Sequence, residues 1–389
     1  MRIGVPREIR KGETRVALAP ASIPVLRKKN HEVYVETGAG TASLMPDEEY
    51  EKAGATVMRT AQEVYEAAQT VLKVQSPGPH PGAGRHEAEM LREGTALIGF
   101  LAPFTNSEAI RILAQRRITS FSMEFIPRIT RAQSMDALSA MATLAGYKAV
   151  IIAADRLPRL FPLLTTAAGT IAPATVLVLG AGVAGLQAVA TAKRLGARVE
   201  AFDPRPAVKE QVESLGAVFV PMETLEDAQT AGGYAKEQSE EFLDRERDTI
   251  AARLPKCNVV VTTAQVFGKR APLLITEDMM KLMPRGAVIV DLAAEQGGNC
   301  ALTRANEWVE QHGVTLYGPT NLPATVPINA SQMYSKTVVT LFEHLYKDPS
   351  KRLDFEDEIT RSACLTHDGR IRNDLVRQAV DERKEIESK

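Results

Sequence analysis

Residues 175–203 read TVLVLGAGVAGLQAVATAKRLGARVEAFD, and this stretch decides the fold. An apolar run leads into a Gly-x-Gly-x-x-Gly turn made by Gly180, Gly182 and Gly185. A helix-forming stretch follows, and a second apolar run ends at Asp203. A strand, a glycine turn, a helix and a second strand in this order are typical of the first βαβ unit of a Rossmann domain.

Each part of this unit has a physical role in binding a dinucleotide. Gly180 allows a tight turn, Gly182 lets the backbone approach a pyrophosphate, and Gly185 lets the helix pack closely against the strand. The helix, predicted from Val183 to about Gly196, directs its positive N-terminal end at the phosphates.

The acid that ends the second strand indicates which dinucleotide binds. Asp203 lies about twenty residues past the glycines, where a carboxylate holds both hydroxyls of an adenine ribose and repels a 2′-phosphate. A glycine triplet by itself also occurs in tight loops that bind nothing, but the flanking strands, helix and acid favour an NAD(H) site. We predict cofactor contacts from Asp203 and from the whole turn: Gly180, Ala181, Gly182, Val183, Ala184 and Gly185.

Length and composition predict a cytoplasmic protein of two domains. The 389 residues exceed what one hydrophobic core usually supports, and 44% hydrophobic with 24% charged residues is an ordinary globular balance. The formal net charge of −1 gives no field that attracts nucleic acid or anionic lipid. From this charge we expect no nucleic-acid partner. We see no apolar run of membrane-helix length and no signal peptide, so we also expect no direct membrane insertion. The three cysteines are far apart, and the Cys and His spacing predicts no metal site.

The alternation of apolar runs and helical spacing predicts an α/β fold with two doubly wound parallel sheets. We place a discontinuous first domain at residues 1–135 and 325–389, and the Rossmann domain at residues 136–324. Strands of the first domain are expected at Arg2–Pro6, His31–Gly38, Thr70–Val74, Thr95–Phe100 and Ile118–Glu124, and strands of the second near Thr175, Arg198, Ala217, Asn258, Ala287 and Val314. One long helix over 134–155 should link the domains, and another over 331–347 should return to the first.

The stretch between Val220 and Asn258 is longer than a crossover helix requires. Its centre, residues 226–236, is polar and places two glycines beside Tyr234. Connections of this length are usually functional lids or disordered, and the two glycines lead us to predict a mobile flap that offers Tyr234 to the cofactor. An inert surface insertion is the alternative.

Polar side chains are concentrated where the first domain leads into the linking helix. Gln133, Asp136 and Ser139 recur every third residue, which would place an amide, a carboxylate and a hydroxyl along one helical face. Arg128 lies upstream and is expected to reach the same cleft and pair with Asp136. Such a face suits the carboxamide and ribose of a nicotinamide, although a capped, solvated helix start explains the same residues without a function.

Several blocks of the sequence together resemble the NAD(H)-binding component of proton-translocating NAD(P) transhydrogenase, over essentially the full length of the chain. They are residues 2–15 and the motifs PRITRAQSMDALS, AGYKAV, VLGAGVAGLQA, DPRP, KEQVESLGA, GGYAKE, VVTTA, VIVDLAAEQGGNC and THDGRI. The resemblance implies that Arg128, Gln133, Asp136 and Ser139 are the catalytic residues around the nicotinamide. It adds Arg205, Tyr234, Thr263 and Ala264 to the cofactor-binding residues.

The resemblance also implies partners and a place in the cell. Hydride would pass directly between NAD(H) on this chain and NADP(H) on a partner subunit, coupled to proton movement through a membrane-spanning subunit. The chain would be a homodimer, held at the cytoplasmic side of the inner membrane by those partners. No proton moves at the reacting centre in such a transfer, so positioning and exclusion of water replace a general acid or base.

Two other classes of function stay open at this point. Alanine dehydrogenase is similar in fold and shares the block that begins at Arg15, but its pattern has a lysine and a histidine where this chain has Gln75 and Ala102. Lys73 is the remaining candidate for an acid or base in an amino-acid dehydrogenase. A non-catalytic protein that responds to NAD is the other alternative, and it predicts binding without hydride transfer.

Overall fold

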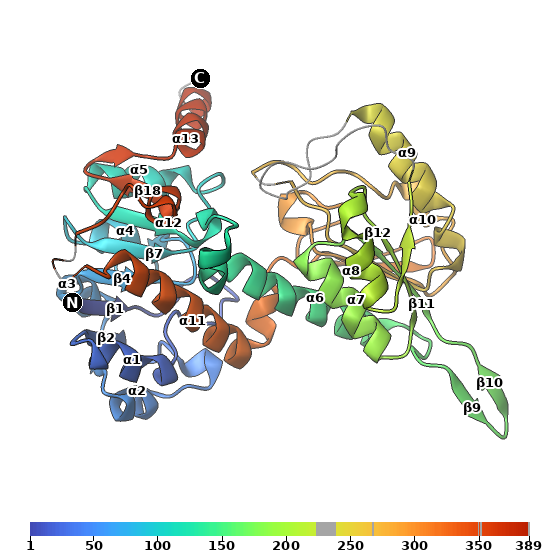
Figure 1. Cartoon of the computed structure of the whole chain (residues 1–389), viewed down its shortest axis with the longest axis horizontal. Coiled ribbons are helices and arrows are strands. Elements are labelled where there is room, and N and C mark those ends of the chain that lie inside the picture. The colour runs from blue at the N-terminus through green and yellow to red at the C-terminus, as the bar shows by residue number, and fades with distance from the viewer. Residues whose placement is uncertain (223–238, 267, 349, 351, 388–389) are drawn as a thin grey trace. The chain divides into compact units, whose positions relative to one another are not determined.

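The computed structural model describes residues 1–222, 239–266, 268–348, 350 and 352–387. The chain forms two compact units, each with its own sheet (Figure 1). Unit 1 comprises Met1–Met141 and Ala324–Lys389, and unit 2 comprises Ala142–Pro323. The division therefore falls after residues 141 and 323, where the sequence-based division was placed after residues 135 and 324.

Unit 1 is built on an eight-stranded sheet in the order β19-β18-β8-β7-β4-β1-β2-β3. Its strands are β1 (Arg2–Val5), β2 (Glu32–Glu36), β3 (Thr56–Met58), β4 (Thr70–Leu72), β7 (Ala96–Gly99), β8 (Thr119–Ser122), β18 (Cys364–His367) and β19 (Arg370–Ile371). The first six in the chain pair in parallel, and β18 and β19 add an antiparallel edge. The sequence therefore predicted the parallel core of this sheet correctly but missed both edges, where the strands are short.

Helices cover the sheet of unit 1 and pack apolar side chains against it. They are α1 (Ile23–Lys28), α2 (Asp47–Ala53), α3 (Ala61–Ala67), α4 (Glu87–Met90), α5 (Ser107–Gln115), α11 (Pro327–Leu345), α12 (Glu358–Ala363) and α13 (Asp374–Glu387). The ribbon β5 (Pro79–His80) and β6 (Arg85–His86) lies outside the main sheet. The C-terminal segment joins the same core, because Val376 and Val380 of α13 are buried with Leu113 of α5.

Unit 2 is a doubly wound sheet in the order β13-β12-β11-β14-β15-β17-β16. Its strands are β11 (Thr175–Leu179), β12 (Arg198–Phe202), β13 (Val218–Val220), β14 (Val259–Thr262), β15 (Val288–Asp291), β16 (Trp308–Gln311) and β17 (Val314–Tyr317). All pair in parallel except β16. Numbered along the chain without β16, the order is the Rossmann order 3-2-1-4-5-6. The predicted Rossmann fold is confirmed.

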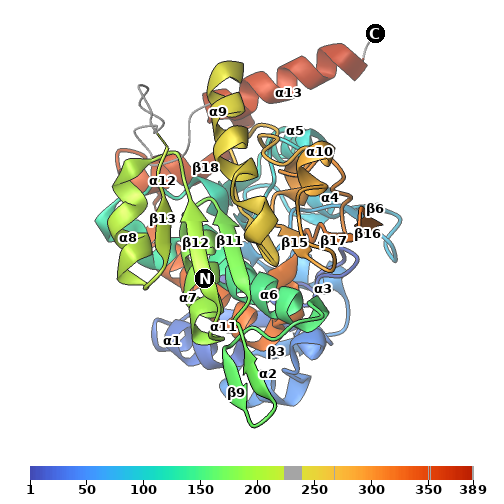
Figure 2. The same cartoon turned by 90° about the vertical axis from the view of Figure 1, so that its right-hand side faces the viewer.

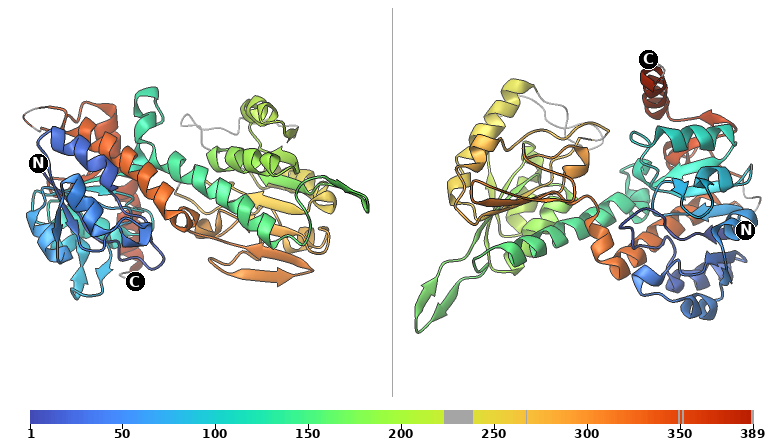
Figure 3. Two further views of the ribbon diagram at one scale, coloured as in Figure 1. Left: turned by 90° about the horizontal axis from the view of Figure 1, so that it is seen from below. Right: turned by 180° about the vertical axis from the view of Figure 1, so that it is seen from behind.

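The central strands of unit 2 are apolar because the sheet is covered on both faces. Helices α7 (Val183–Arg194), α8 (Lys209–Ser214), α9 (Glu240–Ala251) and α10 (Glu277–Met280) connect its strands (Figure 2). A separate hairpin of β9 (Leu164–Thr166) and β10 (Gly169–Ile171) extends from unit 2 and was not predicted (Figure 3, in green).

The long helix α6 (Ala137–Arg156) is the one helix in the described ranges that is long and apolar enough to cross a membrane. This corrects the expectation that the sequence holds no such run. Its apolar character has an explanation within unit 2, since Ala149, Val150 and Ala153 are buried in the core. A core helix passes the same test of length and composition, so α6 alone is weak evidence for a membrane span.

The linking helix also begins later than predicted. Residues Thr130–Met135 form a 3-10 helix, Asp136 leaves the helical conformation at φ −75° and ψ 86°, and α6 starts only at Ala137. The prediction of one continuous helical face through Gln133, Asp136 and Ser139 was therefore wrong. The physical reason is that an aspartate competes for nearby backbone donors, which favours a helix start over a helix interior.

Candidate functional site

The glycine turn after β11 has the shape that its sequence predicts. Gly180 adopts φ +95°, and a Cβ there would lie 2.6 Å from Thr263 Oγ1. A Cβ on Gly185 would lie only 1.8 Å from the Gly180 carbonyl oxygen, so the helix touches the turn through bare backbone. At Gly182 a Cβ would meet nothing within 4 Å. The turn is thus packed behind Gly180 and Gly185 and open in front of Gly182.

The opening lies at the start of α7, a helix of twelve residues whose first residue is Val183. Gly182 precedes it without a side-chain cap, so the positive end of the helix has no side chain of its own over it. An open backbone cradle at a helix N-terminus fits a pyrophosphate. The open backbone at Gly182 and the start of α7 therefore fit the pyrophosphate of a dinucleotide.

A second glycine supports this turn and was not singled out in the sequence. A Cβ on Gly146 of α6 would lie 2.0 Å from the Ala184 carbonyl oxygen, so α6 packs directly on the first turn of α7 within unit 2. The AGYKAV motif is the sequence signal that contained this residue.

Asp203 follows β12 and is 3% exposed. Its Oδ2 accepts hydrogen bonds from the Ala181 N–H (2.7 Å) and from Arg205 Nη2 (2.8 Å). Its Oδ1 accepts from the Arg205 N–H (2.9 Å) and Nε (2.8 Å). The Arg205 guanidinium therefore binds both carboxylate oxygens in a bidentate, fork-like manner. The hydrogen bond to Asp203 raises the pKa of the guanidinium. The acid predicted for the adenosine ribose stands beside the glycine turn and is tied to it.

A buried carboxyl in α9 is electrostatically coupled to the same acid. Glu246 is 4% exposed, and its burial, together with the nearby charge of Asp203, raises its pKa to about 7. Glu246 was not predicted as a site residue, because in the sequence it is one acid among many in a charged stretch.

Thr263 and Ala264 follow β14 and lie directly behind the glycine turn. Thr263 Oγ1 donates to the Gly180 carbonyl (3.0 Å). Asn299 accepts from the Ala264 N–H (3.1 Å) and donates to the Ala264 carbonyl (2.9 Å), so one buried amide holds both polar groups of that residue. The Asn299 N–H in turn donates to buried Asp291 (2.7 Å). Asn299 and Asp291 were missed, although both lie in the VIVDLAAEQGGNC block.

The predicted nicotinamide residues all belong to unit 1, which includes the start of α6. Asp136 caps α6, since its Oδ1 accepts from the Ser139 N–H (2.9 Å) and its Oδ2 from the Ser139 hydroxyl (2.5 Å). Gln133 lies on the preceding 3-10 helix and is exposed, as is Arg128. The structure thus brings Asp136 and Ser139 into direct contact, which is the arrangement expected of a capped helix start.

The segment that carries these residues is anchored by an acid far away in the sequence. Asp357 pairs with Arg131 of the 3-10 helix and with His344 Nε2 of α11 (2.8 Å). Although burial alone raises the pKa of Asp357, its hydrogen bonds from Arg131 and His344 lower that pKa overall. Tyr234 and its loop lie outside the described residues.

The positions that an amino-acid dehydrogenase would use are committed to other contacts in unit 1. Lys73 is fully buried and pairs with Glu87 (2.8 Å) and Glu8 (3.3 Å), and although burial lowers the pKa of its ammonium, these carboxylates raise it overall. Arg15 is 4% exposed and paired with Glu13 (2.6 Å). Because Lys73 is held by two buried carboxylates, the structure does not support it as the acid or base of an amino-acid dehydrogenase.

Two neighbours complete this polar cluster. Gln75 Nε2 donates to Glu13 Oε2 (2.6 Å), so the amide takes part in the Arg15–Glu13 contact. Ala102 adopts φ +45°, and its N–H donates to Glu124 Oε1 (2.8 Å). Neither side chain can exchange a proton.

Comparison with known proteins agrees with this geometry. The profile for "Alanine dehydrogenase/PNT, N-terminal domain" matches residues 4–145, and that for "Alanine dehydrogenase/PNT, C-terminal domain" matches residues 149–374. An NAD(P) transhydrogenase alpha subunit of Rhodospirillum rubrum is 46% identical over 95% of this chain and 97% of its own length.

Solved structures give the same picture. The crystal structure of transhydrogenase from Sinorhizobium meliloti matches with a TM-score of 0.83 and 39% identity, covering 96% of this chain and all of that chain. An L-alanine dehydrogenase matches with a TM-score of 0.81 but only 26% identity, over 98% of this chain and 99% of that one. The two solved structures match the fold of this chain about equally well, but the sequence identity is higher to the transhydrogenase. The chain belongs to the alanine dehydrogenase/PNT family and, within it, to the NAD(P) transhydrogenase alpha subunits.

Proposed function

We propose that unit 2 binds NAD(H) and that the chain exchanges hydride directly with NADP(H) held on a partner subunit. Membership of the family implies NAD(H) binding. The observation that carries the proposal is the open backbone at Gly182, at the start of α7 and one residue from the Ala181 N–H that holds Asp203. The turn would receive the pyrophosphate and Asp203 the adenosine ribose.

Bound NAD(H) supplies the hydride at its nicotinamide ring, and the protein's task is to place that ring. We propose that Gln133 and Ser139 orient the nicotinamide and its ribose, with Asp136 fixing the Ser139 hydroxyl and Arg128 pairing with Asp136 or steering the ring. The Asp136–Ser139 contact supports this assignment, because a hydroxyl held by a carboxylate has a defined direction. Thr263 and Ala264 would border the same nucleotide from behind the glycine turn. Tyr234 would add a contact from its loop.

The proposal needs no general acid or base, since hydride transfer between two nicotinamides moves no proton at the reacting carbons. The contacts of the two buried cations in unit 1 are consistent with a reaction that uses no general acid or base. Arg15 and Lys73, the two cations that would receive a keto or amino acid, are paired with buried glutamates. A substrate carboxylate would have to break those pairs to bind.

Its partners are other transhydrogenase subunits, as the name of the R. rubrum relative implies. We propose that they are an NADP(H)-binding subunit and a membrane-spanning subunit that couples the transfer to proton translocation. The chain would then lie at the cytoplasmic side of the inner membrane through those subunits, with no direct insertion of its own.

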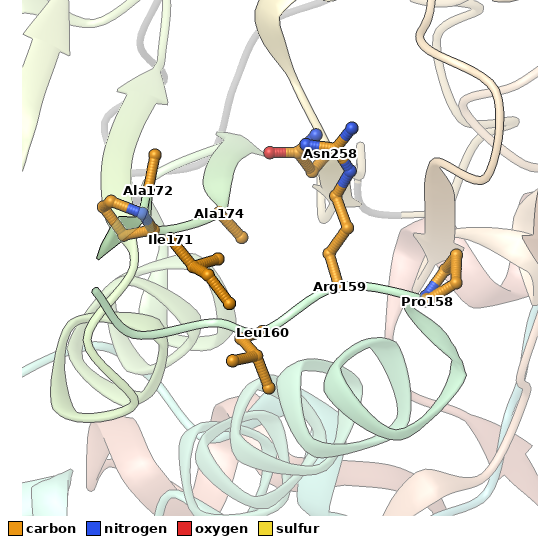
Figure 4. Close-up of a pocket in the computed structure, with 8 residues that line it drawn as sticks. Pro158, Arg159, Leu160, Ile171, Ala172, Ala174 and Asn258 are labelled. Atoms are coloured by element: carbon orange, nitrogen blue, oxygen red, sulfur yellow. The ribbon is translucent and has the colours of Figure 1, made fainter. Parts of the chain in front are cut away.

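We also propose that the chain is a homodimer whose contacts include the β9–β10 hairpin. All six hairpin residues are exposed, among them Leu164 and Ile171 at 42% and 50%. An isolated two-stranded ribbon is marginal in water, so it needs a partner surface. A hollow of about 310 Å³ at its base is lined by Leu160 and Ile171 (Figure 4). Exposed Leu164 and Ile171 give a second copy of the chain an apolar surface to cover, and in a two-fold interface each copy would offer the other the same surface.

The dimer is tested with the double substitution Leu164→Asp and Ile171→Asp. We expect the sedimentation velocity of the purified chain to change from that of a dimer to that of a monomer, with NADH binding retained. A dimer that persists in this variant would rule out the hairpin as the contact.

The proposed activity is tested by NADH-to-NADP⁺ hydride transfer with and without the cognate subunits. Transfer that needs the partners is expected, together with no turnover of alanine plus NAD⁺ by the chain alone. Alanine turnover would favour an amino-acid dehydrogenase instead. NADH binding with no transfer in the complete mixture would favour an NAD-responsive binding protein.

A further inference from the structure

The carboxylate of Asp203 has no acceptor position left for a ribose. A carboxylate offers about four lone-pair sites. Four donors of the protein fill them: the Ala181 N–H, the Arg205 N–H, and Nε and Nη2 of the Arg205 guanidinium. Two ribose hydroxyls can bind Asp203 only if two of these donors leave.

The geometry indicates which two would leave. The Ala181 and Arg205 amides are backbone groups that belong to the turns around Asp203, so they stay with the fold. The guanidinium is held by a flexible side chain and presents two donors, each 2.8 Å from a different carboxylate oxygen. A ribose cis-diol presents its two hydroxyls to a carboxylate in the same side-by-side manner. The guanidinium therefore stands where the diol would bind.

We infer that Arg205, which the resemblance counts among the cofactor-binding residues, instead competes with the adenosine ribose for Asp203 and so sets the affinity and specificity of the site. This inference rests on the proposed NAD(H) site. NAD(H) replaces the guanidinium with its two hydroxyls, which leaves the Asp203 carboxylate fully hydrogen-bonded. NADP(H) has a phosphate in place of one hydroxyl, so it would have to take Arg205 from Asp203 and leave two anions facing each other. The ion pair thus lowers the affinity for both dinucleotides, and the Asp203 carboxylate left facing the 2′-phosphate excludes NADP(H) in addition.

Two variants of Arg205 and one of Asp203 test the inference by isothermal titration with NADH and NADPH. Arg205→Lys keeps the charge but loses the fork, so NADH should bind about fivefold more tightly than to the wild type. Arg205→Ala removes the competitor but also the charge, and should leave NADPH binding undetectable. Asp203→Asn should weaken NADH binding and raise the NADPH-over-NADH preference at least about 100-fold, because the guanidinium is then available to a phosphate.

Controls separate competition from general charge effects. Arg253→Ala breaks an ion pair with Glu200 of β12, the strand that leads to Asp203 (3.4 Å), and should change neither affinity. The double variant Asp203→Asn with Arg205→Ala should lose the gain in NADPH binding. Weaker NADH binding in both Arg205→Lys and Arg205→Ala would overturn the inference, because it would mean that Arg205 holds the cofactor itself. Failure of the wild type to bind NADH would instead overturn the proposed function.

Discussion

Units 1 and 2 place six parallel strands in the same order, yet only unit 2 has a backbone cradle at the point where that order reverses. In a doubly wound sheet this switch point is where ligands bind, between the first and fourth strands. In unit 2, β11 leads into the glycine turn and α7. In unit 1, β1 is followed by Pro6, Arg7 and Glu8, and β4 is followed by Lys73. The two sheets share the same switch point, and the loops that follow their strands differ.

At the switch point of unit 1, buried charged side chains pair with one another. Glu8 accepts from the Val74 N–H (2.6 Å) and pairs with Lys73, which also pairs with Glu87. Tyr65 adds a hydrogen bond to Glu87 (2.8 Å). These buried ions are paired with one another and with nearby backbone and tyrosine donors, which favours a rigid polar core over a binding site. Topology therefore provides the switch point, and the residues that follow the strands determine whether a ligand can bind there.

The sharpest test of the comparison is Gly185→Ala in unit 2. Its Cβ would lie 1.8 Å from the Gly180 carbonyl, so the turn and α7 must separate, and we expect a loss of more than about 4 kcal/mol in the free energy of unfolding. Urea unfolding followed by circular dichroism measures it. Gly182→Ala is the matched control, since its Cβ meets nothing within 4 Å: stability should change little while NADH binding is lost. Normal NADH affinity in the Gly182 variant would place the pyrophosphate elsewhere.

In unit 1 the corresponding change is Lys73→Met. It leaves Glu8 and Glu87 buried without their cation, which should lower the free energy of unfolding by about 3–5 kcal/mol. NADH affinity should not change. Lys29→Met, which breaks an ion pair with Glu343 (2.8 Å) in which the lysine is 55% exposed, should cost less than about 1 kcal/mol. A large loss of NADH affinity in Lys73→Met would show that unit 1 contributes this cluster to the cofactor site.

A smaller effect is expected from Asn299→Ala. The variant leaves the polar groups of Ala264 unpaired behind the glycine turn, at a cost of about 2–3 kcal/mol in stability and a measurable weakening of NADH binding. Calorimetric titration and thermal melts report the two effects separately. Asn258→Ala serves as the comparison, because Asn258 bonds the Thr175 N–H at the opposite end of the sheet (2.9 Å) and should affect stability alone. Equal NADH affinity in both variants would argue against a positioning role for Asn299.

The smallest effect concerns Glu246 and depends on pH. Its pKa is raised from 4.5 to about 7, so the folded chain favours the protonated carboxyl. Its contribution to stability is therefore complete below about pH 4.5 and is lost as the pH rises through about 7. Glu246→Gln should be more stable than the wild type above pH 7, by on the order of 2 kcal/mol, and the difference should vanish near pH 4.5. Urea unfolding of both proteins at several pH values measures this, and a difference that does not vary with pH would contradict it.

Much of the fold was predictable from the sequence because its signals are local. Apolar runs, glycines and the spacing to Asp203 located the Rossmann strands and α7 within a few residues. The short edge strands β18 and β19, the hairpin β9–β10 and the break at Asp136 were not predictable in this way. Edge strands and hairpins carry weak periodicity, and Asp136 ends a helical pattern only because its side chain bonds to Ser139.

For the site, the residue types follow from the sequence alone: glycines that allow a cradle and an acid at the end of β12. The contacts of these residues depend on the folded chain. The fork of Arg205 on Asp203, the hold of Asn299 on Ala264 and the burial of Lys73 all depend on where side chains meet in space. These contacts depend on packing between segments distant in the chain or on side-chain orientation, neither of which any local pattern of residues encodes.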